Sequence, residues 1–236
     1  MKITFPNGDI REYPDGTTGM EIASSISQGL AREALGILLN DSKYDLSRPL
    51  HEDGVVKILT FDSPEGKDIF WHSSAHLMAE AVSQLYPGSK FGVGPALEAG
   101  FYYDIDLPEG VKLSTEDLPN IEKKIQELIN AASNYERQEV TWEEAMKHFK
   151  EVGDEYKVEL LEGLKDQEIT YYKQGTFLDL CRGTHVPNTS YLKFMKLTNI
   201  AGAYWKGDAS RNMMTRIYGI SFPKKKMLEE YLTMLE

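Results

Sequence analysis

The sequence predicts an α+β protein made of a small first part and a larger second part. Three observations predict this: short strand patterns separated by turns over residues 1–61, a linker-like stretch from Phe61 to Gly66, and mixed helical and strand patterns beyond it. With 236 residues, 41% of them hydrophobic, the chain is long enough to form a core in each part.

The first part has the pattern of a β-grasp, ubiquitin-like domain. Its first two strand patterns flank Asn7-Gly8, a strong hairpin signal. Thr17 or Thr18 can cap a helix that we expect to continue to about Gly29, and two strand patterns follow at residues 35–40 and 55–61. Nothing in this part resembles a catalytic group, and we expect His51 in a surface loop.

The second part, residues 62–224, begins with a helix expected from about Gly66 to Tyr86, where Pro87-Gly88 stops it. Its apolar stripe is Ala75, Met78, Ala79, Val82 and Leu85, with His72, His76 and Ser83 on a neighbouring face. Further helices are expected near residues 115–132, 141–151 and 153–164, and a last one over 225–236. The stretch TFLDLC alternates, which places Asp179 and Cys181 on one strand face.

Two spaced pairs raise the question of a metal. His72 and His76 share one helix face, and Cys181 and His185 repeat the same spacing about a hundred residues later. Zinc accepts all four side chains as ligands. The spacing alone leaves three interpretations open: a metal site, a polar pocket without metal, or coincidence.

Composition limits the class of protein. No apolar run approaches the roughly 20 residues of a membrane span, and a single cysteine excludes an internal disulfide, which favours a reducing, cytoplasmic location. The net charge of −11 argues against binding nucleic acid by charge alone. Residues 186–236 nevertheless carry 8 basic and 4 acidic side chains, against 12 and 23 in residues 63–185. A nucleic-acid backbone could approach that basic segment, or the segment is an ordinary solvated surface.

Five stretches of the second part resemble the N-terminal half of bacterial threonyl-tRNA synthetases: HSSAHLMAEAV, GFYYDID, YKVELL, DLCRGTHVP and AGAYWKGD. The first 61 residues resemble the TGS domain that precedes these stretches in the same enzymes. The resemblance implies an editing domain of the threonyl/alanyl second-additional-domain type over residues 62–224. Residues 225–236 would then begin the linker helix to an aminoacylation core that this chain lacks, so we expect a fragment.

The resemblance also implies roles for individual residues. The expected activity is hydrolysis of mischarged Ser-tRNA(Thr), with His72 and Lys157 positioning water and transferring protons, or with Lys157 stabilising negative charge. Six further residues match the pocket that would hold serine and the terminal adenosine: His76, Gly94, Tyr103, Asp179, Cys181 and His185. Trp205 and Lys206 match as markers of the family, and we favour a structural role for them over contact with RNA.

The expected partner is the 3′ end of tRNA(Thr) carrying serine, with no membrane involved. We expect no cofactor in this fragment; zinc and ATP with magnesium would belong to the core of the full-length enzyme. The fragment is expected to be monomeric and the full-length enzyme a homodimer. Two alternatives remain: a zinc-dependent deacylase of the alanyl type, with His72, His76, Cys181 and His185 as ligands, and a non-catalytic RNA-binding module.

Overall fold

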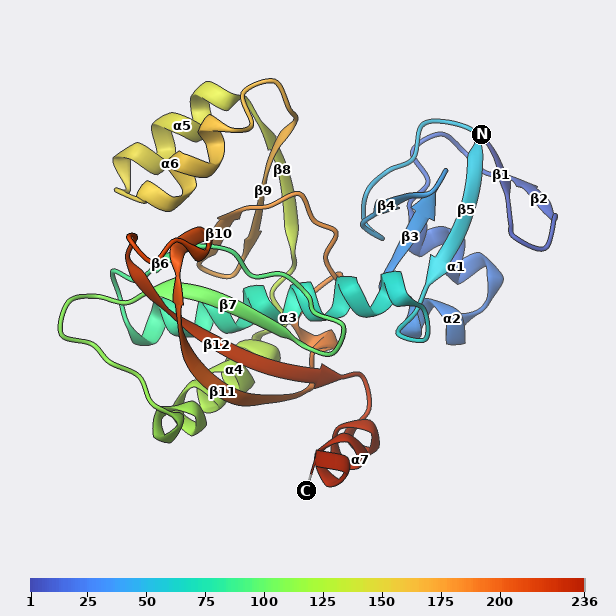
Figure 1. Ribbon diagram of the computed structural model, residues 1–236. Helices are drawn as coiled ribbons and strands as arrows, with labels where there is room; N and C mark the ends of the chain where they lie inside the picture. Colours follow the sequence, from blue (N-terminus) through green and yellow to red (C-terminus); the bar gives the residue numbers. More distant parts are fainter. Residues whose placement is uncertain (236) are drawn as a thin grey trace. The chain divides into compact units, whose positions relative to one another are not determined.

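The computed structural model describes residues 1–235, which form two compact units (Figure 1). The first unit contains Met1–Phe70 and the short segment Gly183–Pro187. The second contains Trp71–Arg182 and Asn188 onward. Sheets and helices lie in both, which confirms the predicted α+β class.

The first unit contains a five-stranded sheet of order β2-β1-β5-β3-β4. Its strands are β1 (Lys2–Thr4), β2 (Ile10–Glu12), β3 (Gly36–Leu39), β4 (Ser42–Tyr44) and β5 (Gly54–Leu59). The first and last strands, β1 and β5, pair in parallel, and the other pairs are antiparallel. The helices α1 (Gly19–Ile26) and α2 (Gln28–Glu33) lie between β2 and β3 in the chain.

The helix predicted to reach Gly29 is divided in two. Thr18 caps α1 as expected, through a capping box with Glu21. Ser27 then adopts an extended backbone and its side chain accepts from the N–H of Leu30, so it caps α2. A serine competes for backbone hydrogen bonds in this way, which the apolar spacing alone does not reveal.

The second unit contains two antiparallel sheets. One has the order β11-β12-β7-β6 and the other β10-β9-β8. Their strands are β6 (Lys90–Phe91), β7 (Phe101–Asp106), β8 (Glu136–Val140), β9 (Ile169–Gln174), β10 (Phe177–Leu180), β11 (Phe194–Tyr204) and β12 (Met213–Phe222). The helices are α3 (Pro64–Leu85), which begins in the first unit, α4 (Leu118–Ala131), α5 (Trp142–Glu151), α6 (Glu155–Glu162) and α7 (Lys225–Leu235).

The helix α3 is buried on all sides from Ser73 to Val82, so the apolar stripe predicted for it is only part of its buried surface. Hydrogen bonds connect it to segments on different sides. Trp71 Nε1 donates to the carbonyl of Ser221 on β12, and the Tyr135 hydroxyl donates to the carbonyl of Ser73. A central helix of this kind is a rigid support for side chains that point from it into a site. Among the described residues, no helix is both long and apolar enough to cross a bilayer.

Candidate active site

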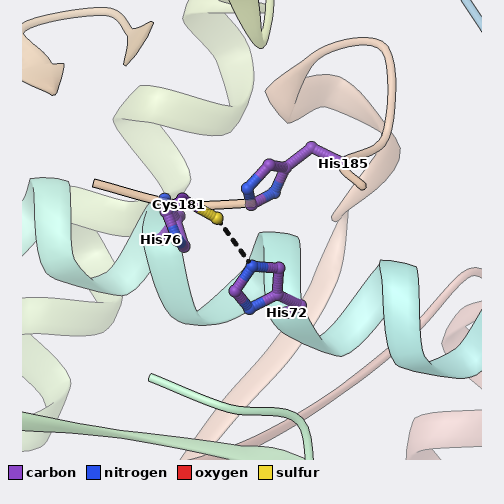
Figure 2. Close-up of side chains that lie close together, drawn as sticks. All are labelled: His72, His76, Cys181 and His185. Carbon is purple, nitrogen blue, oxygen red and sulfur yellow. Dashed lines mark hydrogen bonds between the residues drawn. The ribbon is translucent and has the colours of Figure 1, made fainter. Parts of the chain in front are cut away.

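The helix α3 and the end of β10 bring together the two spaced pairs found in the sequence. The side-chain ligand atoms of His72, His76, Cys181 and His185 all lie within 4.8 Å of one another (Figure 2). The two histidine rings on α3 meet edge to face, with centroids 4.8 Å apart. The backbone N–H of His185 donates to Asp45 at 2.9 Å, which holds the CRGTH segment at that point.

Two hydrogen-bond contacts help to orient the ring of His72. Its Nδ1 lies 3.1 Å from the carbonyl oxygen of Gly94 and its Nε2 lies 3.1 Å from the Cys181 sulfur. A carbonyl accepts only, so Nδ1–H is the donor there and Nε2 faces the thiol with its lone pair. A thiol is a weak donor. Water can therefore replace it at Nε2.

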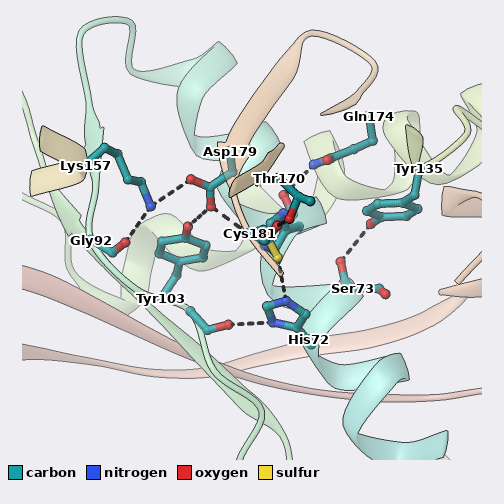
Figure 3. Close-up of polar contacts among 12 residues, drawn as sticks. His72, Ser73, Gly92, Tyr103, Tyr135, Lys157, Thr170, Gln174, Asp179 and Cys181 are labelled. Carbon is teal, nitrogen blue, oxygen red and sulfur yellow. Dashed lines mark hydrogen bonds and ion pairs between the residues drawn. The ribbon is translucent and has the colours of Figure 1, made fainter. Parts of the chain in front are cut away.

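A buried polar network centred on Asp179 adjoins the histidines (Figure 3). Lys157 is 3% exposed, and its ammonium group donates to Asp179 Oδ1 and to the carbonyl of Gly92, both at 2.7 Å. The hydroxyl of Tyr103 donates to Asp179 Oδ2, which lies 3.7 Å from Nε2 of His76. Burial raises the pKa of Asp179, but the charge and hydrogen bond of Lys157, the neighbouring His76 and the hydrogen bond from Tyr103 together outweigh burial, so the pKa is lowered.

His76 is held neutral. Burial is the first cause, since it disfavours the imidazolium, and the neighbouring His72 and Lys157 act in the same direction against the attraction of Asp179. Together they lower the pKa of His76 to about 3. At neutral pH, Lys157 and Asp179 are therefore the ion pair of this network, and His76 is a neutral neighbour.

Gly94 and Tyr103 pack against each other. A Cβ at position 94 would lie 2.3 Å from the Tyr103 ring, so only glycine allows this approach while its carbonyl contacts His72. Tyr103 is 1% exposed and donates its hydroxyl hydrogen bond. Tyr103 therefore both packs in the core and makes a hydrogen bond within the site.

A cavity of about 240 Å³ reaches the cluster at Cys181. It is bordered by α6, β9 and the residues that follow β10. Its lining is Leu160, Leu164, Glu168, Ile169, Thr170, Leu180, Cys181 and Arg182. An apolar recess with a few polar groups at its margin is typical of a site for a small organic group.

The sequence did not reveal how the helix carrying Lys157 is held in place. Glu159, two residues further along α6, accepts from Trp205 Nε1 at 3.0 Å and pairs with Lys206 at 2.7 Å and with Arg211. Trp205 also meets Tyr156 of the same helix edge to face, with ring centroids 4.9 Å apart. The AGAYWKGD motif thus anchors α6, which agrees with the structural role favoured for Trp205 and Lys206.

The basic character of residues 186–236 is partly neutralised within the protein. Four of the eight basic side chains in this segment pair with carboxylates elsewhere in the second unit: Lys196 with Glu122, Lys206 and Arg211 with Glu159, and Arg216 with Asp104. Arg216 binds both oxygens of the buried Asp104, and this contact is the main cause of its raised pKa. These four cations are therefore less available to a phosphate backbone than the charge count indicated.

Comparison with known families identifies both units. The TGS domain matches residues 1–60, and the threonyl and alanyl tRNA synthetase second additional domain matches residues 169–218. The second match includes β9, β10 and the CRGTH segment. The fold and the cluster therefore define a TGS domain followed by a domain of the synthetase editing type.

Individual relatives specify the class further. Over all 236 residues, the chain is 56% identical to the threonine–tRNA ligase of Parabacteroides distasonis, 54% to that of Porphyromonas gingivalis and 52% to that of Cytophaga hutchinsonii. It covers 36% of the length of each of these proteins. The chain belongs to the threonyl-tRNA synthetase family and corresponds to its N-terminal region.

Proposed function

We propose that this chain hydrolyses Ser-tRNA(Thr), the mischarged product that a threonyl-tRNA synthetase must remove. The observation that carries the proposal is the buried Lys157–Asp179 pair beside the cluster of His72, His76 and Cys181, in a domain of the editing type. The energetic reason is general. A difference of one methyl between serine and threonine gives about 10–200-fold discrimination, so a second, hydrolytic site is needed.

The reaction adds water to the ester carbonyl carbon and breaks its bond to the ribose oxygen, which takes up a proton. His72 is placed to accept the proton of the attacking water, because its Nε2 carries the ring's lone pair and faces a thiol, which is a weak donor. The ammonium group of Lys157 has two acceptors, Asp179 and the Gly92 carbonyl. Because Lys157 is the cation of the ion pair with Asp179, we assign it to stabilising the oxyanion.

Six residues make up the proposed binding pocket: His76, Gly94, Tyr103, Asp179, Cys181 and His185. Asp179 already accepts from Lys157 and Tyr103, which favours an orienting role over direct pairing with the ammonium group of serine. The cavity beside Cys181 offers room for part of the substrate. We further propose that the chain acts as a monomer in the cytoplasm, on the aminoacylated 3′ end of tRNA(Thr).

Single-turnover deacylation with excess protein tests the proposal. Ser-tRNA(Thr) should be hydrolysed and Thr-tRNA(Thr) spared, and His72→Ala should lower the rate constant of the bound complex about 10²–10⁴-fold. His51→Ala is the matched control, because His51 lies on the surface beside Asp15 in the first unit. Equal hydrolysis of both substrates would contradict the proposed specificity. No hydrolysis of either would favour the non-catalytic RNA-binding alternative.

A second candidate is a zinc-dependent deacylase of the alanyl type, favoured by the four clustered ligand atoms of His72, His76, Cys181 and His185. Their chemistry fits zinc, which takes nitrogen and sulfur ligands at about 2.0–2.3 Å. Bound there, zinc would supply a water of lowered pKa. We favour the metal-free site, because Lys157 and Asp179 already provide charged groups beside the cluster.

Elemental analysis should find well under one zinc per chain, and chelation should leave hydrolysis unchanged; stoichiometric zinc would support the second candidate.

A further inference from the structure

A buried carboxylate outside the proposed pocket lies on the same helix as its two histidines. Glu80 follows His76 by four residues and His72 by eight, and it is 1% exposed. Burial raises the pKa of Glu80 despite its hydrogen bonds to Thr176 and Gln84. Acidic side chains are almost never fully buried unless they are paired, so the position of Glu80 calls for an explanation.

One oxygen of Glu80 holds the turn between β9 and β10. Oε1 accepts from the backbone N–H of Thr176 at 2.9 Å and from Nε2 of Gln84 at 3.3 Å. The turn consists of Gly175 and Thr176, since Gln174 pairs with Phe177 across it. Gly175 has a φ of 51°, and a Cβ there would lie 2.1 Å from Oε1 of Glu80. The turn is therefore fitted directly against this carboxylate.

Two glutamines add to the same connection. Gln84 on α3 donates to the hydroxyl of Thr176 at 2.9 Å, and Gln174 at the end of β9 donates to the carbonyl of His76 at 3.0 Å. The second bond reaches the backbone of a pocket histidine. Helix and hairpin are thus linked by polar contacts at the level of the site.

The hairpin carries pocket residues a short distance beyond this turn. Asp179 is two residues into β10 from Phe177, and Cys181 follows two residues later on the same face. A strand rises about 3.3 Å per residue and is stiff over such a length. The position of the turn along α3 therefore sets where Asp179 meets His76 and where Cys181 meets His72.

We propose that Glu80 is a positioning residue: it fixes the β9–β10 turn on α3 and thereby places Asp179 and Cys181 against the two histidines. A purely stabilising role explains the site less well. The second oxygen, Oε2, is buried without a hydrogen-bond partner among the described residues, and leaving a buried polar atom unpaired destabilises the folded protein. A well-packed apolar side chain would avoid that cost but could not accept from the turn.

The test uses Glu80→Gln and Glu80→Met. Glutamine keeps an acceptor for the Thr176 N–H, whereas methionine has similar size without one. Cys181 is the only cysteine of the chain, so its rate of reaction with a maleimide reports its surroundings alone. Glu80→Met should change that rate and Glu80→Gln should keep the parent value. Ile125→Ala, a cavity variant in α4, controls for loss of stability alone.

The deacylation readout rests on the proposed function and is measured separately. With Ser-tRNA(Thr), Glu80→Met should lower the single-turnover rate constant at saturation about 10²-fold, since a displacement of about 1 Å can have that effect, and Glu80→Gln should restore it. A parent protein without deacylase activity would overturn the proposed function, while the maleimide rates would still decide the positioning role.

A further variant covers the case in which Glu80→Met does not fold. Gly175→Ala leaves Glu80 intact but forces a Cβ onto its Oε1, so it should displace the turn and change the maleimide rate in the same way. The proposal is overturned if the folded Glu80→Met protein, or Gly175→Ala in its place, reacts with maleimide at the parent rate.

Discussion

Two charged residues of α6, Lys157 and Glu159, are two positions apart in the chain, but the groups of charged side chains that they form have different surroundings. Lys157 pairs with Asp179, and both are 3% exposed. Glu159 pairs with Lys206 and Arg211, whose side chains are 49% and 43% exposed. A buried charge must be paired to be tolerated, whereas an exposed pair is weakened by water and salt. Burial, rather than the presence of charge, therefore separates the group proposed for chemistry from the group that anchors the helix.

The largest difference should appear in the reaction rate. Lys157→Ala removes the cation proposed to stabilise the oxyanion, so the single-turnover rate constant with Ser-tRNA(Thr) should fall about 10²–10⁴-fold, like the loss of other groups acting in the transition state. Lys206→Ala is the matched control, because it removes a lysine from the exposed group, and it should stay within a few-fold of the parent. Equal losses from both variants would show that the two groups do not differ in function.

Stability should separate the groups as well. Lys157→Met leaves Asp179 buried without its cation and should lower the free energy of unfolding by about 3–5 kcal/mol, as for other broken buried pairs. Adding Asp179→Asn removes the uncompensated charge and should recover part of this loss. Urea denaturation of the two single variants and the double variant gives the coupling energy. A coupling near zero would mean that the pair adds nothing beyond its separate side chains.

Sequence patterns indicated the two histidines and the strand face of Asp179, whereas Lys157 came only from the resemblance to the family. The spacing of His72 and His76, and the alternation of Asp179 with Leu178, follow from helix and strand periods that can be read directly. The Gly92 carbonyl that accepts from Lys157 is 65 residues away in the chain. The contacts of Glu80 could not be predicted either, because the part of α3 that carries it is buried on all sides and no polar face distinguishes it. Contacts of this kind depend on tertiary packing and leave no local pattern.

The β11–β12 hairpin was missed for a related reason. Its strand β11 reads FMKLTNIAGAY, in which buried and exposed residues do not alternate, and the pairing register shifts between Leu197 and Asn199. A bulge of this kind removes the period of two that identifies a strand. The strands β8 and β9 were also not predicted, and four successive residues of β9, Ile169–Tyr172, are buried. The fold class and most of the first unit depend on turn signals and on the Thr18 cap, which are local and were predicted, whereas the Ser27 cap and the short strand β4 were not.

A smaller loss of stability is expected on changing Trp205, whose buried indole donates a hydrogen bond to Glu159 of the exposed group. Trp205→Phe keeps an aromatic ring beside Tyr156 but loses the hydrogen bond from Nε1 to Glu159. Hydrogen bonds to charged groups contribute about 1.5–3 kcal/mol, so the urea midpoint should fall accordingly. Trp142→Phe provides a comparison, since Nε1 of Trp142 donates to a neutral carbonyl, that of Leu161, and its loss should cost less.

The smallest effect, and the one with a defined sign against pH, concerns Glu159. Its hydrogen bonds to Arg211, Lys206 and Trp205 lower its pKa to about 2, against about 4.3 in an unfolded chain. A lowered pKa contributes stability that is present above the unfolded value and is lost as the pH falls through the folded value. Glu159→Gln should therefore be less stable than the parent at pH 7, by about 0–1 kcal/mol per exposed pair, and the gap should close between pH 4 and 2. Urea midpoints at several pH values measure this gap, with Glu151→Gln as an exposed control on α5. A gap that stays constant or widens in acid would mean that the exposed group stabilises the protein by packing rather than by charge, and the contrast with Lys157 and Asp179 would then rest on burial of the pair alone.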